Sequence, residues 1–200
     1  MKLRILSCVL LSLAACGCSS APSARIMSAD EGDVVGNRRA GAATYDRLIS
    51  GTVEKLLKGY SAARNDLGDK LKVVSLEIEN ASGEEIGDWT DQLYELIDTS
   101  INTSGRFQNV SIRFVRQALR ENRLRSEDLF IPAKRRLFLQ TLEANGDVVQ
   151  ALIFPKLTRG STGGGSGVTQ RNYALTLELV DVKTGESDKE TTRLRKEYSK

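Results

Sequence analysis

Histidine is absent from this chain of 200 residues, and cysteine, proline and tryptophan are rare, with three, three and one residues respectively. Without histidine, the chain lacks the commonest general base and the commonest metal ligand. All three cysteines lie at or before position 18, so no disulfide can cross-link the rest of the chain. A zinc site would need further thiolate or imidazole ligands, which the sequence does not supply. The early cluster of cysteines therefore needs another explanation.

The first residues of the chain have the layout of a secretion signal. Lys2 and Arg4 precede a short uncharged apolar run, which is followed by small residues. The run is far shorter than the roughly 20 residues that a membrane-spanning helix needs. A disulfide between Cys16 and Cys18 would close a strained ring around Gly17 and stabilise little. A processing signal is therefore the better interpretation of these cysteines.

The end of this segment, Leu13-Ala14-Ala15-Cys16, resembles the cleavage motif of bacterial lipoproteins. In that family, the leader is removed directly before the cysteine, which carries lipid on its thiol and on its new amino group. The resemblance implies that Leu13, Ala14 and Ala15 form the signal-peptidase motif. It also implies a covalent lipid, palmitate included, on Cys16. Gly17 follows instead of the aspartate that retains enterobacterial lipoproteins at the inner membrane, so we expect the periplasmic face of a Gram-negative outer membrane.

Composition predicts one globular domain behind a tether. Residues 16–43 are dominated by glycine, alanine, serine and charged residues, which is typical of a flexible segment. This segment would have a root-mean-square span of about 30 Å and a full extension of roughly 90 Å. We therefore expect a signal peptide at 1–15, a lipidated tether at 16–43 and a globular domain at 44–200. Removing Lys2 and Arg4 from the formal charge of +3 leaves +1, which gives no support for nucleic-acid binding.

Hydrophobic spacing predicts the elements of the first half of the domain. Apolar residues at helical spacing indicate a helix from Tyr45 to Tyr60, with Thr44 as a possible cap and Gly59 near its end. A strand is expected at 72–78 and a turn at 80–85. A second helix carries an apolar stripe that runs from Ile86 to Ile101 and includes Leu96, and it should end at Ser104-Gly105.

The middle of the domain predicts a short strand and two helices. After a strand at 106–110, Ser111 is a plausible cap for a helix at 112–122, with Ile112, Val115, Ala118 and Leu119 facing inward. Alternation of Val110, Ile112 and Phe114 would instead extend the strand. Pro132 suits the first turn of a further helix that ends near Gly146. Its core side would consist of Leu137, Phe138 and Leu142.

The last third of the chain predicts three strands. Residues 148–158 have the apolar density of a strand buried on both faces, and residues 170–182 alternate like a half-buried strand. Lys183-Thr184-Gly185 indicates the turn to a charged strand at 188–198, which suits a sheet edge. The order of elements predicts an α/β fold: a single mixed-sheet α/β sandwich with a C-terminal β-hairpin.

No motif for catalysis is found. The segment TRGSTGGGSG at 158–167 lacks the lysine of a phosphate-binding loop, and a strand follows it where such a loop needs a helix, so we expect a hairpin loop. No pair of carboxylates is spaced in a way that indicates catalysis. Glu84, Glu85 and Asp88 are expected at a helix start, where negative charge is favourable. The sequence therefore predicts that the protein is not an enzyme.

Arg113, Arg116, Arg120 and Arg123 are spaced to share one face of the expected helix at 112–122. One interpretation is a solvated face, whose cations pair with nearby Glu121, Glu127 and Asp128. The other is a docking patch for an acidic partner surface or an anionic wall polymer. The sequence leaves both open.

Three stretches of the domain have a recognisable pattern: VVSLEIENASGEEIGDWTDQLYELIDTSINTSGRFQNVS, ALRENRL and YALTLELVDVKTGE. Together they resemble one family, the LpoB-type lipoprotein activators of class A penicillin-binding proteins. The resemblance covers about residues 70–198 together with the lipoprotein signal. The closing hairpin is also similar to those of curli-secretion lipoproteins and of the amino-terminal domain of TolB, so the resemblance implies a TolB amino-terminal-like fold.

The resemblance implies a function. Members of this family are anchored in the outer membrane and reach through the peptidoglycan to the regulatory domain of a bifunctional synthase, a class A penicillin-binding protein. Binding stimulates cell-wall synthesis, while the lipoprotein itself has no cofactor and no small-molecule substrate. This chain differs in its tether, which is of modest length and has Pro22 as its only proline. An alternative is a curli-type secretion subunit or another envelope-assembly lipoprotein, although no additional pair of strands suited to a membrane is found. A periplasmic enzyme would need a carboxylate site that the sequence does not reveal.

Lipidation at Cys16 is directly testable by metabolic labelling with a fatty-acid analogue. We expect the wild-type protein to incorporate the label and Cys16→Ser to incorporate none, because the acylated thiol is lost. Cys18→Ser is the matched control and should label normally. Label retained by Cys16→Ser would show that the site is assigned wrongly.

Overall fold

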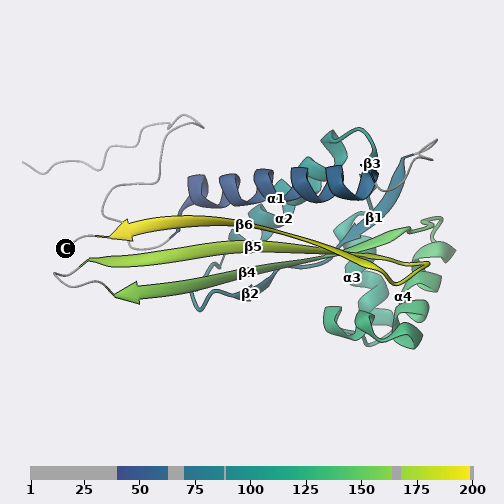
Figure 1. Cartoon of the computed structure of the whole chain (residues 1–200). Coiled ribbons are helices and arrows are strands. Elements are labelled where there is room, and N and C mark those ends of the chain that lie inside the picture. The colour runs from purple at the N-terminus through teal and green to yellow at the C-terminus, as the bar shows by residue number, and fades with distance from the viewer. Residues whose placement is uncertain (1–39, 63–69, 88, 164–167, 199–200) are drawn as a thin grey trace, which may run out of the picture.

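The structure is a computed structural model that describes residues 40–62, 70–87, 89–163 and 168–198. Helices and strands alternate in its first part, and three long strands close the chain (Figure 1). The elements are α1 (Ala42–Ala62), β1 (Leu71–Ser75), β2 (Glu79–Ala81), α2 (Trp89–Thr103), β3 (Phe107–Asn109), α3 (Ile112–Glu121), the 3₁₀ helix η1 (Ser126–Phe130), α4 (Pro132–Ala144), β4 (Ala151–Gly163), β5 (Thr169–Asp181) and β6 (Ser187–Tyr198).

The strands form one mixed sheet, as predicted. Their order is β3-β1-β4-β5-β6, and β2 pairs with β4 beyond the end of β1. The pairs β1–β3, β1–β4 and β2–β4 are parallel, whereas β4, β5 and β6 are antiparallel. The charged strand β6 lies at an edge, which confirms that expectation. The β4–β5 pairing continues to Gly163, which lies opposite Thr169. The strand β4 therefore extends through Gly160 into residues 158–167, which were expected to form a hairpin loop.

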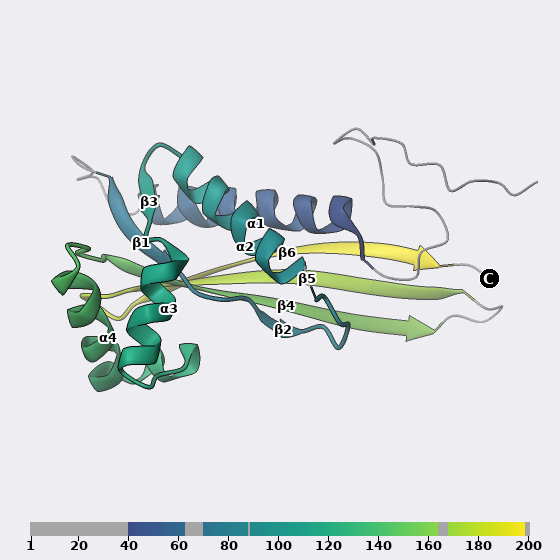
Figure 2. The same ribbon diagram turned by 180° about the vertical axis from the view of Figure 1, so that it is seen from behind.

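Helices cover the two faces of the sheet unequally. α1 and α2 lie side by side on one face, while α3 and α4 lie on the other face near one end of the sheet (Figure 1, Figure 2). Because side chains alternate along a strand, Val73 joins the cluster under α1 and α2, and Val74 joins the cluster under α3 and α4. In the same way, Ile153 faces the first cluster and Leu152 the second. β4 is therefore buried on both faces at its start, as predicted, and becomes exposed toward Gly163.

The first two helices follow the predicted stripes with different boundaries. α1 begins at Ala42, so Thr44 lies inside the helix and is buried instead of capping it. Ile86 is buried ahead of α2, which begins at Trp89. Leu96 lies at the rim of the stripe and is 36% exposed. The helix ends before Gly105, whose φ of 76° is a left-handed conformation that glycine adopts without strain.

Two further expectations were wrong. Residues Asn80 and Ala81 belong to β2 and not to a turn, because they pair with Leu157 and Thr158 of β4. Leu137 is 50% exposed, whereas Phe138 and Leu142 are fully buried and Leu139 packs against the same cluster, because Leu137 lies on the side of α4 turned away from the core. The inward side of α3 is confirmed: Val115 and Ala118 are buried, and Ile112 and Leu119 pack against the same cluster. The segment is therefore a helix and not an extension of the preceding strand.

The predicted turn after β5 is organised by a buried carboxylate. Asp181, only 3% exposed, accepts hydrogen bonds from the backbone N–H groups of Lys183 and Thr184 at 2.9 and 2.8 Å. Its other oxygen accepts the hydroxyl of Tyr60 in α1 at 2.9 Å. Gly185 completes the turn with a φ of 76°. The aspartate of this hairpin thus joins its turn to the first helix.

Candidate docking surface

α3 carries the predicted arginines, and its ends decide which of them share a face. The side chain of Ser111 caps its start by accepting the N–H of Arg113 at 3.4 Å, as predicted. At its end, the Asn122 side chain donates to the Ala118 carbonyl and to Thr141 of α4. The next residue, Arg123, has a φ of 53°, a left-handed conformation that cannot continue the helix. Arg123 therefore lies beyond α3, and only Arg113, Arg116 and Arg120 project from its exposed face.

Arg116 connects α3 to other elements. Its Nε donates to Oε1 of Glu77, between β1 and β2, at 2.7 Å, and its Nη2 donates to Oδ1 of Asp91 in α2 at 3.3 Å. The hydrogen bond to Glu77 raises the pKa of Arg116 above its ordinary value. Arg116 thus holds α3 against the rest of the fold. Its guanidinium group is paired with Glu77 and Asp91 and is not available to a partner.

Arg113, Arg120 and Arg123 form no ion pair with the acidic residues that the sequence places near them. Glu121 accepts from Gln117 at 2.8 Å, Asp128 from Lys134 at 2.6 Å, and Glu127 lies 3.7 Å from Arg125. Within the described ranges, Arg113, Arg120 and Arg123 form no ion pair. They present unpaired guanidinium groups to the solvent.

Exposed apolar side chains lie on the same part of the molecule. In the described residues, six large apolar side chains are exposed, and all but Leu96 lie between residues 114 and 148: Phe114, Phe130, Ile131, Leu137 and Val148. Phe114 is on the exposed side of α3, and Phe130 and Ile131 lie at the η1–α4 junction. Aromatic residues and arginine are the types enriched in protein interfaces. The sequence reasoning missed this apolar component, although a phenylalanine on the polar side of an amphipathic helix was a signal for it.

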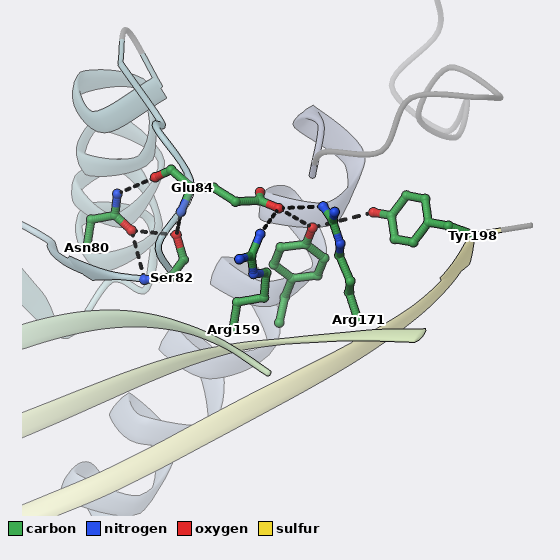
Figure 3. A network of polar contacts seen from close by, with 7 residues as sticks. Asn80, Ser82, Glu84, Arg159, Arg171 and Tyr198 are labelled. Atoms are coloured by element: carbon green, nitrogen blue, oxygen red, sulfur yellow. Dashed lines mark hydrogen bonds and ion pairs between the residues drawn. The ribbon is translucent and has the colours of Figure 1, made fainter. Parts of the chain in front are cut away.

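A buried carboxylate organises the opposite end of the sheet. One oxygen of Glu84 accepts hydrogen bonds from Arg159 at 2.6 Å, from Arg171 at 2.8 Å and from Tyr173 at 2.9 Å (Figure 3). The hydroxyl of Tyr173 also lies 3.4 Å from that of Tyr198. The Glu84 side chain is only 7% exposed. This cluster joins the segment after β2 to β4, β5 and β6.

The backbone around Glu84 is fixed by local hydrogen bonds. Its N–H donates to the Ser82 hydroxyl at 3.1 Å, and its carbonyl accepts from the Asn80 side chain at 2.8 Å (Figure 3). The carboxylate also accepts the backbone N–H of Ala40, the first described residue. Burial would raise the pKa of Glu84, but the hydrogen bonds from Arg159, Tyr173 and Ala40 outweigh it and lower that pKa below its ordinary value. Glu84 is therefore a structural anchor and not the helix-dipole partner that the sequence suggested.

Other sequence-based expectations are not addressed by this part of the chain. Leu13, Ala14, Ala15, Cys16 and the loop at 164–167 lie outside the described residues. Within the described ranges, no group of three acidic, cysteine or histidine side chains could hold a metal ion. In the same residues, no helix has the length and apolar character needed to span a membrane.

Comparison with known proteins identifies the fold. A scan against protein-family models finds no match, and a search of curated proteins finds none either. Among solved structures, the chain is similar to the LpoB C-terminal domain from Salmonella enterica, with 15% identity and a TM-score of 0.50 over 78% of this chain and 98% of that chain. The chain has the LpoB fold. The Escherichia coli LpoB C-terminal domain also matches, with 16% identity and a TM-score of 0.49 over 74% of this chain and 97% of that one. The NMR structure of E. coli LpoB matches with 13% identity and a TM-score of 0.47 over 96% and 94% of the two chains.

The sequence motifs that resemble the LpoB-type family are those that determine the LpoB fold here. Gly105 ends α2 and places Phe107, 1% exposed, in the core. Ala118 lets α3 pack closely on the second cluster, and Asp181 and Gly185 form the β5–β6 turn. None of these residues lies among the exposed arginines or aromatic rings. The core and turn residues of these motifs therefore account for the LpoB fold, whereas Arg120 and Arg123, which also lie in the ALRENRL stretch, are exposed.

Glu84→Gln tests the anchor of the LpoB fold described above. The substitution removes the negative charge that accepts hydrogen bonds from Arg159 and Arg171. It should lower the free energy of unfolding by about 2 kcal/mol at pH 7. Because folding lowers the pKa of Glu84, its contribution is present above the unfolded-state pKa and is lost as pH falls through the folded-state pKa. The difference between wild type and Glu84→Gln should therefore shrink below about pH 4.

Urea unfolding at several pH values measures this difference. The exposed neighbour Glu85 provides the matched control, and Glu85→Gln should unfold like the wild type. Equal stabilities of wild type and Glu84→Gln at pH 7 would contradict the anchoring role.

Proposed function

We propose that this protein is a non-catalytic outer-membrane lipoprotein that binds and activates a bifunctional peptidoglycan synthase, a class A penicillin-binding protein. The observation that carries the proposal is the LpoB fold, which covers 98% of the Salmonella domain. The lipoprotein signal ending at Cys16 supports the same conclusion, because it supplies the expected membrane anchor. The combination of an anchor and a domain without a recognisable catalytic site favours a binding module.

The two ends of the domain suit an anchored protein that docks at a distance. Ala40, where the proposed tether meets the domain, is bound to Glu84 at the end of the sheet that contains Arg159, Arg171 and Tyr198. α3 and α4 lie at the other end (Figure 2). The thirteen residues of β4 run between these ends over about 40 Å. With lipid on Cys16, the tether would therefore join the domain at the end that is farther from α3 and α4.

The length of the domain also compensates for the short tether. The 24 residue steps from Cys16 to Ala40 cannot exceed about 80 Å. Adding the length of β4 brings the maximum reach from the membrane to roughly 120 Å. This reach is longer than that of the tether alone. It makes contact easier with an inner-membrane synthase whose regulatory domain projects into the periplasm.

Arg113, Arg120 and Phe114 provide the proposed contact. Unpaired guanidinium groups next to an exposed aromatic ring favour a partner surface that is acidic at its rim and apolar at its centre. Activation requires only that this contact be stronger in the active conformation of the synthase, because a ligand shifts a population by its difference in affinity.

Glycan polymerisation by purified class A synthases, with and without the full-length lipoprotein in detergent, tests the proposal. The wild type should increase the rate of polymerisation. Arg113→Glu combined with Arg120→Glu should weaken binding of the lipoprotein to the synthase by tenfold or more through charge repulsion. Arg47→Glu with Lys55→Glu on α1 makes the same charge change on another face and should behave like the wild type. Arg116 is left unchanged because it holds α3 in place.

The proposal would fail if the wild-type lipoprotein neither bound nor stimulated any class A synthase of its source organism. Stimulation that the α3 double variant fully retained would instead place the contact on another surface.

A further inference from the structure

A hollow of about 680 Å³ lies between η1 and the face of the sheet that α1 and α2 do not cover. Its sheet side contains a row of paired residues across three strands: Phe154 of β4 lies opposite Glu178 of β5, which lies opposite Lys189 of β6. Its other side is formed by Glu127 and Phe130 of η1. The hollow is distinct from the arginine face of α3 and has no role in the contact proposed above.

The floor of the hollow is aromatic. The ring of Phe130 stacks on that of Phe154, with the ring centres 4.3 Å apart and the planes inclined by 27°. Phe130 nevertheless remains 51% exposed. A stacked pair that leaves so much aromatic surface in water is an incomplete core and a typical anchor point for a partner side chain.

η1 places its two contributing side chains on one face. In a 3₁₀ helix, residues three apart lie one above the other, so Glu127 and Phe130 share a face. Leu129 is fully buried in the core and fixes the rotation of η1 about its axis. Asp128 accepts the backbone N–H of Arg125 at 2.9 Å and the ammonium group of Lys134 at 2.6 Å, which fixes both ends of the segment. A partner would therefore meet a backbone segment that is already ordered, which lowers the entropy lost on binding.

The charge of the lining favours a cation. Four carboxylates line the hollow, against two lysines: Glu77, Glu79, Glu127 and Glu178 against Lys156 and Lys189. Glu79, Glu178 and Glu77 are each paired with a cation within 2.8 Å. Glu127 differs, because its cation, Arg125, is 3.7 Å away and the two side chains are 70% and 82% exposed. Glu127 is thus the carboxylate most readily available to a partner.

We infer that the hollow receives an arginine side chain from the synthase, with its guanidinium stacked on Phe130 and hydrogen-bonded to Glu127. The planar guanidinium suits this site because it combines stacking on an aromatic face with directed hydrogen bonds to a carboxylate, whereas the ammonium of lysine is a point charge. An acidic side chain would be repelled by Glu127, whose own cation is 3.7 Å away. A purely apolar side chain would remove the Glu127 carboxylate from water without compensation. The inference rests on the proposed function, since it names a second contact between the same two proteins.

Binding of the full-length lipoprotein in detergent to its synthase tests the inference. Glu127→Gln should weaken binding several-fold, and Phe130→Ala and Glu127→Arg should each weaken it tenfold or more. Glu95→Gln and Leu96→Ala on α2 are the matched controls, because both residues are exposed on the other face, and each should bind like the wild type. Glu127→Gln alters only an exposed side chain, so its effect does not depend on the folding of Phe130→Ala.

A second measurement identifies the chemistry of the partner residue. The synthase is labelled with phenylglyoxal, an arginine reagent, in complexes saturated with wild type or with Phe130→Ala. One synthase arginine should be protected by the wild type and become reactive with the variant. Protection of no arginine, or of a lysine in a parallel acetylation experiment, would overturn the inference.

The two proposals fail in different ways. If the wild type binds the synthase and Glu127→Gln and Phe130→Ala bind as tightly, only the arginine site is wrong. If the wild type itself binds no class A synthase, the proposed function is wrong, and the arginine site fails with it.

Discussion

The start of β4 is the constraint on which the structure depends. Ala151, Leu152 and Ile153 are all buried, and they alternate between the cluster under α1 and α2 and the cluster under α3 and α4. The same strand pairs in parallel with β1 and β2 and antiparallel with β5. Without it, neither pair of helices would have a common surface to cover. Toward Gly163, β4 leaves the core and carries Arg159, which helps to hold Glu84 and, through it, the beginning of the described chain.

This arrangement gives the domain two ends of different character. At one end, Glu84 connects Ala40, β4 and β5 through hydrogen bonds. At the other end, α3, η1 and α4 cover only part of the sheet face and leave Phe114, Phe130 and Leu137 exposed. Because the same strands extend between the two ends, one sheet fixes how the Glu84 cluster and the exposed side chains of α3, η1 and α4 lie relative to each other.

Local periodicity was sufficient to predict the fold class and most elements. The stripes of α1 and α2, the alternation of β5 and the charged edge strand β6 are properties of contiguous sequence. β2 escaped prediction because its three residues are all exposed and form a strand only by pairing with β4, far along the chain. Thr44 and Leu137 were misplaced because helix boundaries and the width of a buried face are set by packing and not by apolar character alone.

The candidate site was predictable only in part for the same reason. Three arginines share a face of α3 because spacing dictates it, but the end of the helix at Asn122 removed Arg123 from that face. The partners of Arg116 are 39 and 25 residues away, and Arg159 is 75 residues from Glu84. The pairing of Phe130 with Phe154 likewise depends on the fold. The motifs that resemble the LpoB-type family contain turn and core residues, so they predicted the architecture, but they did not show which exposed residues form a contact surface.

The proposed function depends on contact between the α3 end of this domain and a class A penicillin-binding protein in the living cell. The most direct measurement places a photoreactive amino acid at Gln117, an exposed position of α3 near Arg113 and Arg120, crosslinks in intact cells and identifies the captured protein by mass spectrometry. We expect a class A penicillin-binding protein to be captured from Gln117 and none from Ser50 on α1. Capture of the synthase from Ser50 but not from Gln117, or of no synthase from either position, would contradict it.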